Sequence, residues 1–258
     1  MKEEVFVFDV DGTLTEPRSI INPDFESYML EFCKSNDVYL VSGSDRKKTF
    51  EQIGPNLYDA VKGIWQCNGN EYWEGNRRVS KTDYKPDYDF KHFLTQIVHR
   101  SKYPIKVGDH IELRTGMVNF SVVGRAANKD QREAYYKWDC KNRERIDIAD
   151  QINRSYKDLH ATIGGMISID ISPKGNNKSQ VANHLNKEYK YIHFFGDKCE
   201  VGGNDYPIAL TIELAKMGEV YRVSDWKDTR ALLQSWERMK PYFEKHGITK
   251  QENYNGEV

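Results

Sequence analysis

The feature that most constrains this chain is the string VFVFDVDGTLT near its start, where a short apolar run ends in two aspartates. Residues 5–8 are apolar at every position, which is typical of a strand buried on both faces of a parallel sheet. Asp9 and Asp11 follow, at the strand end beyond which open α/β sheets bind ligands. Two carboxylates there can serve one Mg²⁺ ion, and Gly12 permits a sharp turn. The string therefore predicts an active site at a sheet edge.

Further buried strands follow along the chain, with helical patterns between them. Residues 38–41 (VYLV) end in SGSD, and residues 64–67 (IWQC) lead into an Asn-Gly turn and a hairpin. Residues 191–197 (YIHFFGD) again end in an acid, and residues 219–223 (EVYRV) lead into a helix near Asp225. Alternation of strand and helix predicts an α/β fold, with a parallel sheet and helices on both of its faces.

The middle of the chain has a different pattern. A helix, two alternating strands and a charged helix over residues 129–157 are followed by two strands that meet at Gly164-Gly165. This order predicts an α+β unit with an antiparallel sheet, inserted into the α/β core as a cap. The expected division is core 1–82, cap domain 83–175 and core 176–258, the last with a polar C-terminal tail.

Composition excludes several functional classes. Of the 258 residues 38% are apolar, which suffices for a packed core, and a net charge of −1 gives no general attraction for nucleic acid. No apolar run reaches 18 residues, so we expect no membrane span, and the acidic start argues against a signal peptide. The four cysteines lack metal-site spacing and are expected to be free thiols in the cytoplasm.

The opening string resembles motif one of the haloacid dehalogenase superfamily. Asp9 is suited to attack phosphorus and form an aspartyl-phosphate. The resemblance then implies three further groups: Ser42 for the phosphoryl group, Lys178 for its charge, and Asp197 for the metal site, with Asn204 or Asp205 nearby. Asp11 would act as general acid and base. The implied catalytic residues are Asp9, Asp11, Ser42 and Lys178, and the implied Mg²⁺ ligands are Asp9, Asp11 and Asp197.

The arginines of the insert separate a mutase from a phosphatase. Arg114 and Arg125 lie eleven residues apart on expected neighbouring strands, and Arg132 begins the next helix. Guanidinium groups match phosphate oxygens, so three of them could hold a phosphate distant from the reacting one. A mutase needs two phosphate sites, because either end of its bisphosphate intermediate must be held. The alternative is that these arginines are surface charges paired with acids such as Glu112.

From about Phe6 to Arg230 the chain resembles eukaryotic-type α-phosphomannomutases. The strings FDVDGTLT, E.R.GM.N.S..GR, FFGDK and GGND carry the resemblance. It implies a cap that closes over the core and a homodimer formed through the caps. The substrate-binding residues that it implies are Arg18, Arg114, Arg125, Arg132, Ser168 and Asp170.

The resemblance implies an isomerase that interconverts mannose 6-phosphate and mannose 1-phosphate and feeds GDP-mannose synthesis. Its expected cofactors are Mg²⁺ and a hexose 1,6-bisphosphate activator. A sugar-phosphate phosphatase and a non-catalytic sugar-phosphate sensor remain the alternatives. Two departures matter: Ser42 replaces a glycine, and the acidic, threonine-containing loop after GGND is absent, which leaves an accessory cation site open. The choice between mannose and glucose is open too, because these sugars differ in the orientation of one hydroxyl group.

Overall fold

The computed structural model describes residues 1–246 of the protein and contains two sheets. In the larger sheet five neighbouring strands run parallel, and a hairpin adds two antiparallel strands at one edge. Its seven strands, in spatial order, are β11 (Gly218–Arg222), β10 (Tyr189–Gly196), β1 (Lys2–Asp9), β2 (Val38–Val41), β3 (Gly63–Gln66), β4 (Glu71–Glu74) and β5 (Arg77–Lys81). The predicted α/β fold is confirmed; residues 247–258 of the expected polar tail lie outside the described part.

Helices cover both faces of this sheet, which explains the unbroken apolar run of β1. Phe6 and Phe8 pack with α1 (Pro23–Ser35), α2 (Arg46–Ala60) and α8 (Trp226–His246). Val5 and Val7, on the opposite face, pack with α6 (Ser179–Leu185) and α7 (Tyr206–Leu214). Successive residues of a strand point to opposite faces, so both sets must be apolar. We call the larger sheet with these helices the core lobe.

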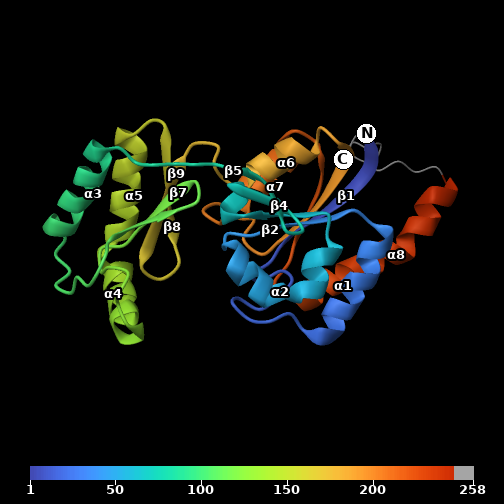
Figure 1. Ribbon diagram of the computed structural model, residues 1–258, viewed down its shortest axis with the longest axis horizontal. Helices are drawn as coiled ribbons and strands as arrows, with labels where there is room; N and C mark the ends of the chain where they lie inside the picture. Colours follow the sequence, from blue (N-terminus) through green and yellow to red (C-terminus); the bar gives the residue numbers. More distant parts are fainter. Residues whose placement is uncertain (247–258) are drawn as a thin grey trace, which may run out of the picture.

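The smaller sheet is antiparallel throughout. Its strands, in spatial order, are β6 (Ile111–Arg114), β7 (Met117–Phe120), β9 (Ser168–Pro173) and β8 (Leu159–Gly164). One face carries Val118, Phe120 and Ile169, which pack against α3 (Tyr88–Arg100) and α5 (Glu144–Ser155). In Figure 1 both helices lie on the side of the sheet that is remote from the core lobe. We call residues 88–173 the cap lobe. The opposite, polar face of its sheet lies toward the core lobe.

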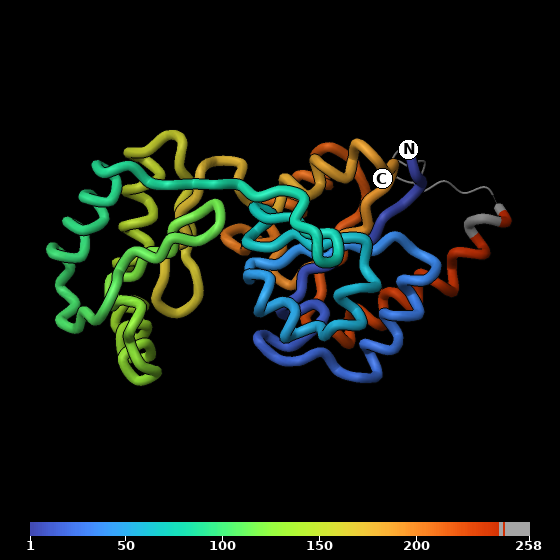
Figure 2. Tube along the Cα trace, viewed as in Figure 1, coloured from blue at the N-terminus to red at the C-terminus, as the bar shows by residue number. Residues whose placement is uncertain are grey.

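The chain crosses between the lobes twice. Figure 2 shows it leave the core lobe after β5, build the cap lobe and return before α6. The confirmed part of the prediction is an antiparallel α+β unit inserted into the α/β core, while the exact domain limits 83–175 stay a prediction. Within the described residues 1–246, no helix combines the length and the apolar character that crossing a membrane requires.

The charged segment 129–157 is not the single helix that the sequence predicts. It forms α4 (Lys129–Asn142) and α5, separated at Arg143, which has a φ of 57°. The Asp139 carboxylate accepts hydrogen bonds from the backbone and the guanidinium of Arg145, at 2.8 and 2.7 Å. This buried pair fixes the break, because the ends of the two helices meet on it.

Candidate active site

The centre of the site is a buried lysine between two aspartates. Asp9 ends β1, Lys178 directly precedes α6, and Asp205 directly precedes α7. Lys178 Nζ donates to Asp9 Oδ1 at 2.5 Å and to Asp205 Oδ1 at 2.6 Å. Lys178 and Asp205 have no exposed surface. The sheet therefore brings together two residues, Asp9 and Lys178, that are 169 positions apart in the sequence.

A third carboxylate, that of Asp197 after β10, joins this cluster. One oxygen of each of Asp9, Asp197 and Asp205 lies within 4.8 Å of the others. Gly12 permits the approach: its φ is 86°, and a Cβ there would lie 2.4 Å from Asp197 Oδ2. Among the described residues, Asp197 Oδ1 is buried without a hydrogen-bond partner. An unpaired carboxylate oxygen between other carboxylates fits a hard divalent cation such as Mg²⁺.

The electrostatics of the cluster favour added positive charge. Burial, and then the charge of Asp205, raise the pKa of Asp9 to about 7, while Lys178 opposes this rise. For Lys178 burial acts against the charged form, but Asp205 and Asp9 outweigh burial and raise the pKa of the ammonium. Lys198 Nζ also pairs with Asp197 Oδ2 at 2.8 Å. A divalent cation held by Asp9, Asp197 and Asp205 would keep Asp9 ionised near neutral pH.

The carboxylate of Asp11 lies in a different set of contacts. Its Oδ1 accepts from the backbone N–H of Arg18 at 2.8 Å and from Gln52 Nε2 at 2.9 Å. Arg18 is exposed and has a φ of 62°, a conformation that aims its amide at Asp11. Asp11 is thus outside the three-carboxylate group, and its predicted side-chain ligation of Mg²⁺ stays a prediction. The contacts suit a fixed acid–base group instead.

Ser42 organises the loop that follows β2. Its hydroxyl is fully buried and accepts from the backbone N–H of Ser44 at 3.0 Å. Asn68, in the 3₁₀ turn η1 (Cys67–Gly69), donates its backbone N–H to the Ser42 carbonyl at 2.9 Å. The structure therefore shows Ser42 holding the loop around Gly43, and direct contact between its hydroxyl and a phosphoryl group stays a prediction.

The cap lobe gathers the three predicted arginines. Arg114 Nη2 and Arg125 Nε both approach Glu112 Oε2, at 2.9 and 2.7 Å. Arg132 Nη2 donates to the backbone carbonyl of Arg125 at 3.0 Å. We call Arg114, Arg125 and Arg132 the arginine cluster. Two guanidinium groups that meet on one carboxylate oxygen, with Arg132 beside Arg125, would suit an anionic ligand.

Ser168 and Asp170 lie two residues apart on β9, at the polar face of the cap sheet. Asp170 Oδ1 accepts from Asn119 Nδ2 at 2.5 Å. Burial raises the pKa of Asp170, whereas Asn119, Arg114 and Arg125 act in the opposite direction, so the carboxylate lies within the field of the cluster. Ser168 is buried, and its hydroxyl donates to the Gly164 carbonyl at 3.3 Å. Asp170 is thus beside the arginines and Ser168 contacts the β8–β9 turn, and substrate binding by either residue stays a prediction.

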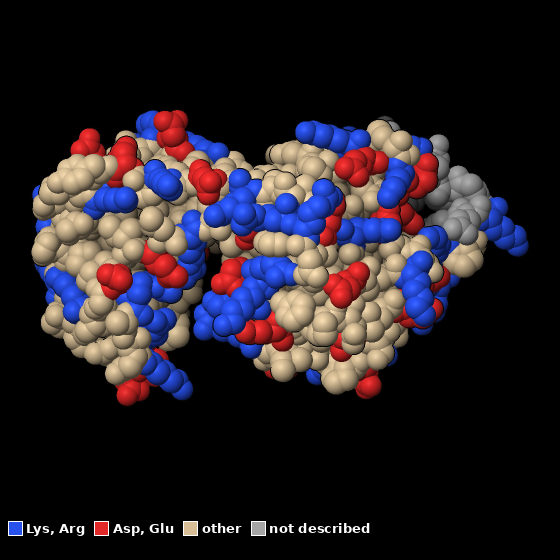
Figure 3. All heavy atoms as spheres, in the orientation of Figure 1, with Lys and Arg blue, Asp and Glu red and all other residues tan. Residues whose placement is uncertain are grey.

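The turn between β6 and β7 reaches the core lobe. Gly116 has a φ of 69°, and a Cβ at this position would lie 2.4 Å from the side chain of Asn70. Asn70 follows η1, next to the loop of Ser42. The arginine cluster therefore lies above the edge of the core sheet that carries Asp9. In Figure 3 a cleft separates the two lobes, and Lys and Arg side chains border it on both sides.

Four contributors were missed or left unassigned at the sequence level. Asp205 was noted beside Asp197 without a role, although its position in GGND was a usable signal. Glu112 precedes Arg114 by two residues, a spacing that places both side chains on one face of a strand. Gln52 and Asn119 carry no local signal, because only the folded chain brings them to Asp11 and Asp170.

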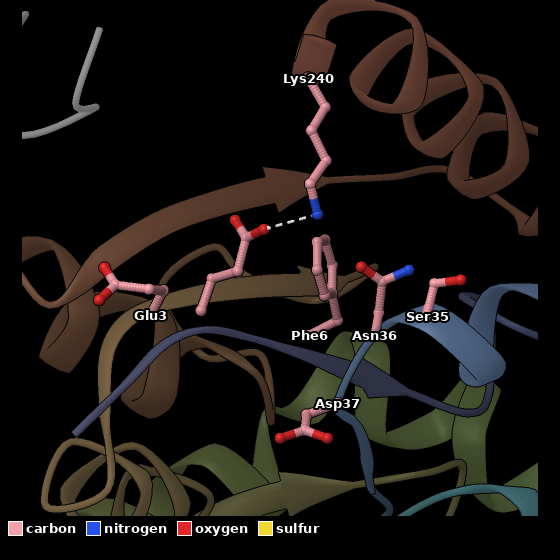
Figure 4. A pocket seen from close by; sticks show the side chains of 7 residues that line it. Glu3, Phe6, Ser35, Asn36, Asp37 and Lys240 are labelled. Carbon is pink, nitrogen blue, oxygen red and sulfur yellow. Dashed lines mark hydrogen bonds and ion pairs between the residues drawn. The ribbon is translucent and has the colours of Figure 1, made fainter. Parts of the chain in front are cut away.

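A separate pocket opens at the opposite end of the core sheet. It encloses about 280 Å³ between the start of β1, the segment before β2, and α8 (Figure 4). Lys240 Nζ pairs there with Glu4 Oε1 at 3.3 Å, and Glu3 and Asp37 add further carboxylates. Asp9 lies at the other end of β1, so this pocket is not part of the candidate active site.

Comparisons with known proteins agree on one family. A sequence model of the family described as eukaryotic phosphomannomutase matches residues 25–236. The phosphomannomutase of Drosophila melanogaster is 34% identical over 243 residues, which are 90% of this chain and 94% of that protein. Phosphomannomutase 1 of Dictyostelium discoideum is 33% identical over 233 residues, 87% of this chain and 94% of that protein.

Solved structures support the fold. SMU.1108c from Streptococcus mutans aligns over 92% of this chain and all of its own, with a TM-score of 0.62 and 15% identity. IMP-bound, N-terminally truncated IMP-nucleotidase from Plasmodium falciparum covers 91% of this chain and 68% of its own, with a TM-score of 0.58 and 17% identity. At such sequence identities the comparison shows a shared fold and nothing about function.

Proposed function

Because this chain belongs to the eukaryotic phosphomannomutase family, we propose that it interconverts mannose 6-phosphate and mannose 1-phosphate through an aspartyl-phosphate and a hexose bisphosphate. The observation that supports the proposal is the presence of one charged cluster in each lobe. We assign the reacting phosphate to Asp9 and Lys178 in the core lobe, and the distal phosphate to the arginine cluster in the cap lobe. A hydrolase that releases phosphate needs only the first. The product would supply GDP-mannose synthesis in the cytoplasm.

Removal of a phosphoryl group from the bisphosphate takes place at Asp9. An oxygen of Asp9 attacks phosphorus of the bound phosphate, and the bond between phosphorus and the sugar oxygen breaks. Lys178, which already contacts Asp9, offsets charge on the transferring phosphoryl group. Asp11, oriented by Arg18 and Gln52, donates a proton to the leaving sugar oxygen. A magnesium ion held by Asp9, Asp197 and Asp205 would supply further positive charge at the phosphoryl oxygens.

Donation of a phosphoryl group to the substrate, and the turn that follows it, use the arginine cluster. While one phosphate reacts at Asp9, the guanidinium groups of Arg114 and Arg125 hold the phosphate at the other end of the sugar, with Arg132 beside them. The free hydroxyl of the monophosphate attacks phosphorus of the phosphorylated Asp9, Asp11 takes the proton of that hydroxyl, and the Asp9 carboxylate leaves, which gives the bisphosphate. The bisphosphate then turns round, so that the phosphate which was held becomes the one that Asp9 removes. Free hexose 1,6-bisphosphate would prime Asp9, which makes it the expected activator.

Association through the cap lobes is part of the proposal. Leu113, Ile163 and Met166 are large apolar residues of the cap lobe with exposed fractions of 53%, 40% and 43%. β6 and β8 are the two edges of the cap sheet, and such edges are available for pairing. We expect a homodimer in sedimentation velocity, and Leu113→Lys should shift it to the monomer.

The test of the proposed activity is a phosphorus NMR time course. The protein receives mannose 1-phosphate, Mg²⁺ and a trace of glucose 1,6-bisphosphate. We expect conversion to mannose 6-phosphate with little inorganic phosphate. Rapid release of inorganic phosphate would establish a phosphatase instead, and an unchanged spectrum with demonstrable binding would establish a sensor.

A further inference from the structure

One carboxylate oxygen occupies the place between two arginines of the cap lobe. Glu112 Oε2 lies 2.9 Å from Arg114 Nη2 and 2.7 Å from Arg125 Nε. A phosphate oxygen would make the same contacts with the same atoms. Arg114 and Glu112 are partly open to solvent, with side-chain exposures of 32% and 39%. The carboxylate of Glu112 therefore occupies the position where an external anion would bind, and its partly exposed side chain can move away.

The charges of the cluster make occupation by both anions unfavourable. The three arginines of the cluster and the two carboxylates beside Arg114 and Arg125, those of Glu112 and Asp170, sum to one net positive charge. Asp170 is partly buried and accepts a hydrogen bond from Asn119, so it stays. A phosphate dianion added beside Glu112 would leave the cluster negative, whereas departure of Glu112 leaves it neutral. Like charges at contact distance repel, so the incoming phosphate and Glu112 compete.

We propose that Glu112 is a displaceable counter-anion of the distal phosphate site: it orders Arg114 and Arg125 in the free enzyme, leaves when phosphate binds, and returns to release it. Glu112 is thus a positioning residue, which acts through the two arginines. The inference rests on the proposed function, since it concerns the release that a mutase needs. An intermediate that must turn round has to leave the arginines in every cycle.

The core lobe offers a partner for the displaced carboxylate. Lys48, in the first turn of α2, is exposed and lies within the electrostatic reach of Glu112. Arg114 and Arg125 are the stronger influences, and all three cations lower the pKa of Glu112 against the effect of its burial. Glu112 is therefore ionised while it contacts the arginines, and a glutamate that turns into solvent keeps its charge at neutral pH. Its turn toward Lys48 would connect capture of the distal phosphate with contact between the lobes.

The test compares affinities for one ligand, glucose 1,6-bisphosphate, by titration calorimetry. All chains carry Asp9→Asn, so that no phosphoryl transfer occurs. Glu112→Gln keeps a hydrogen-bond acceptor but removes the competing charge. We expect this variant to bind the bisphosphate about fivefold more tightly, because the ion pair that the phosphate must displace is partly exposed and contributes about 1 kcal/mol. Asp150→Asn removes an equal charge from an exposed position of α5 and should leave affinity unchanged.

Steady-state kinetics with Asp9 intact give the second readout. Glu112→Gln should lower kcat and KM together, because slower release limits turnover while binding improves. Glu112→Ala also deletes the contact with Arg114 and Arg125 and should likewise increase affinity for the bisphosphate. This second variant keeps the test valid if the glutamine side chain adopts a different position from that of Glu112. Equal or weaker bisphosphate binding by both variants would overturn the inference and leave the proposed function intact. No bisphosphate binding by the parent, together with no mutase activity, would overturn the proposed function and this inference with it.

Discussion

The two charged clusters of the molecule are built in opposite ways. In the core lobe Lys178 and Asp205 are completely buried, and Lys178 is paired on two sides. In the cap lobe Arg114 and Arg125 retain 32% and 24% of their side-chain exposure and share a single carboxylate oxygen. Burial fixes the groups that we assign to the chemistry, whereas solvent contact leaves the groups that we assign to substrate binding free to exchange partners.

This difference has an energetic counterpart. Removing one partner of a buried ion pair leaves an uncompensated charge and costs about 3–5 kcal/mol, while exposed pairs contribute about 0–1 kcal/mol. Substitutions in the core cluster should therefore affect both folding and activity, unless they remove the charge without leaving another unpaired. Substitutions in the arginine cluster should affect activity alone.

The largest expected effect is that of Asp9→Asn. Loss of the nucleophile should reduce mutase activity by at least about 10⁴-fold, as removal of covalent nucleophiles does in other enzymes. The amide is neutral and nearly the same shape, and burial already raises the pKa of Asp9, so the fold should survive. Activity is measured by NMR, and thermal unfolding serves as the control. Retention of activity would remove the aspartyl-phosphate from the mechanism.

The second effect concerns Lys178→Met. Without the ammonium, Asp9 and Asp205 lose their common partner inside the core, and we expect a loss of about 3–5 kcal/mol in the free energy of unfolding. Denaturant titration of the metal-free chain measures it. The matched control is Lys190→Met, which breaks an exposed pair with Glu3 and should cost under about 1 kcal/mol. Equal losses would mean that the two clusters do not differ as described.

The third prediction addresses the arginine cluster with Arg125→Ala. We expect kcat/KM for mannose 1-phosphate to fall about 10²-fold, the size of effect that truncating a charged binding partner produces. Hydrolysis of a small phosphoryl donor that has only one phosphate should hardly change, and unfolding should shift little. Arg154→Ala, on the exposed surface of α5, is the control. A parallel loss of both activities would argue against a distal phosphate site.

The smallest effect is a pH-dependent stabilisation by Mg²⁺. The pKa of Asp9 rises from 3.8 to about 7 on folding without metal, so the stability due to its proton is lost as pH rises through about 7. Magnesium binds the ionised form and should therefore raise Tm more at pH 8 than at pH 5.5, by about 2–4 °C. Differential scanning fluorimetry measures this shift, and Asp9→Asn should abolish its pH dependence. An equal rise in Tm at both pH values would contradict binding of the cation to ionised Asp9.

Prediction from sequence succeeded where the signal was local. The apolar run of β1 and the acid after β10 identify strand ends, and the ends of parallel strands meet, so the approach of Asp9 to Asp197 could be expected. The direction of the Asp11 side chain could not be predicted, because it depends on a hydrogen bond from Gln52 in α2. The break at Arg143 was missed for a similar reason, since a buried contact outweighs helical periodicity.

The same limit applies to the arginine cluster. Its three members carried a recognisable spacing, but nothing in the sequence shows that Arg114 and Arg125 share one oxygen of Glu112. Surface pairing was an open alternative for these arginines, and the structure shows that pairing and convergence occur together. Only the position of the cap lobe over the edge of the core sheet gives the pairing a functional meaning.

The most direct test of the account follows a labelled phosphate through a single turnover. Enzyme primed with unlabelled hexose 1,6-bisphosphate is mixed with an equal amount of mannose 1-phosphate whose phosphate carries ¹⁸O, and the mannose 6-phosphate is analysed by mass spectrometry. If Asp9 donates its phosphoryl group and then takes the one at the other end of the sugar, the first product carries unlabelled phosphate. First-turnover mannose 6-phosphate that retains the ¹⁸O label would contradict the account, because the substrate's own phosphate would then have moved without exchange with the phosphate on Asp9.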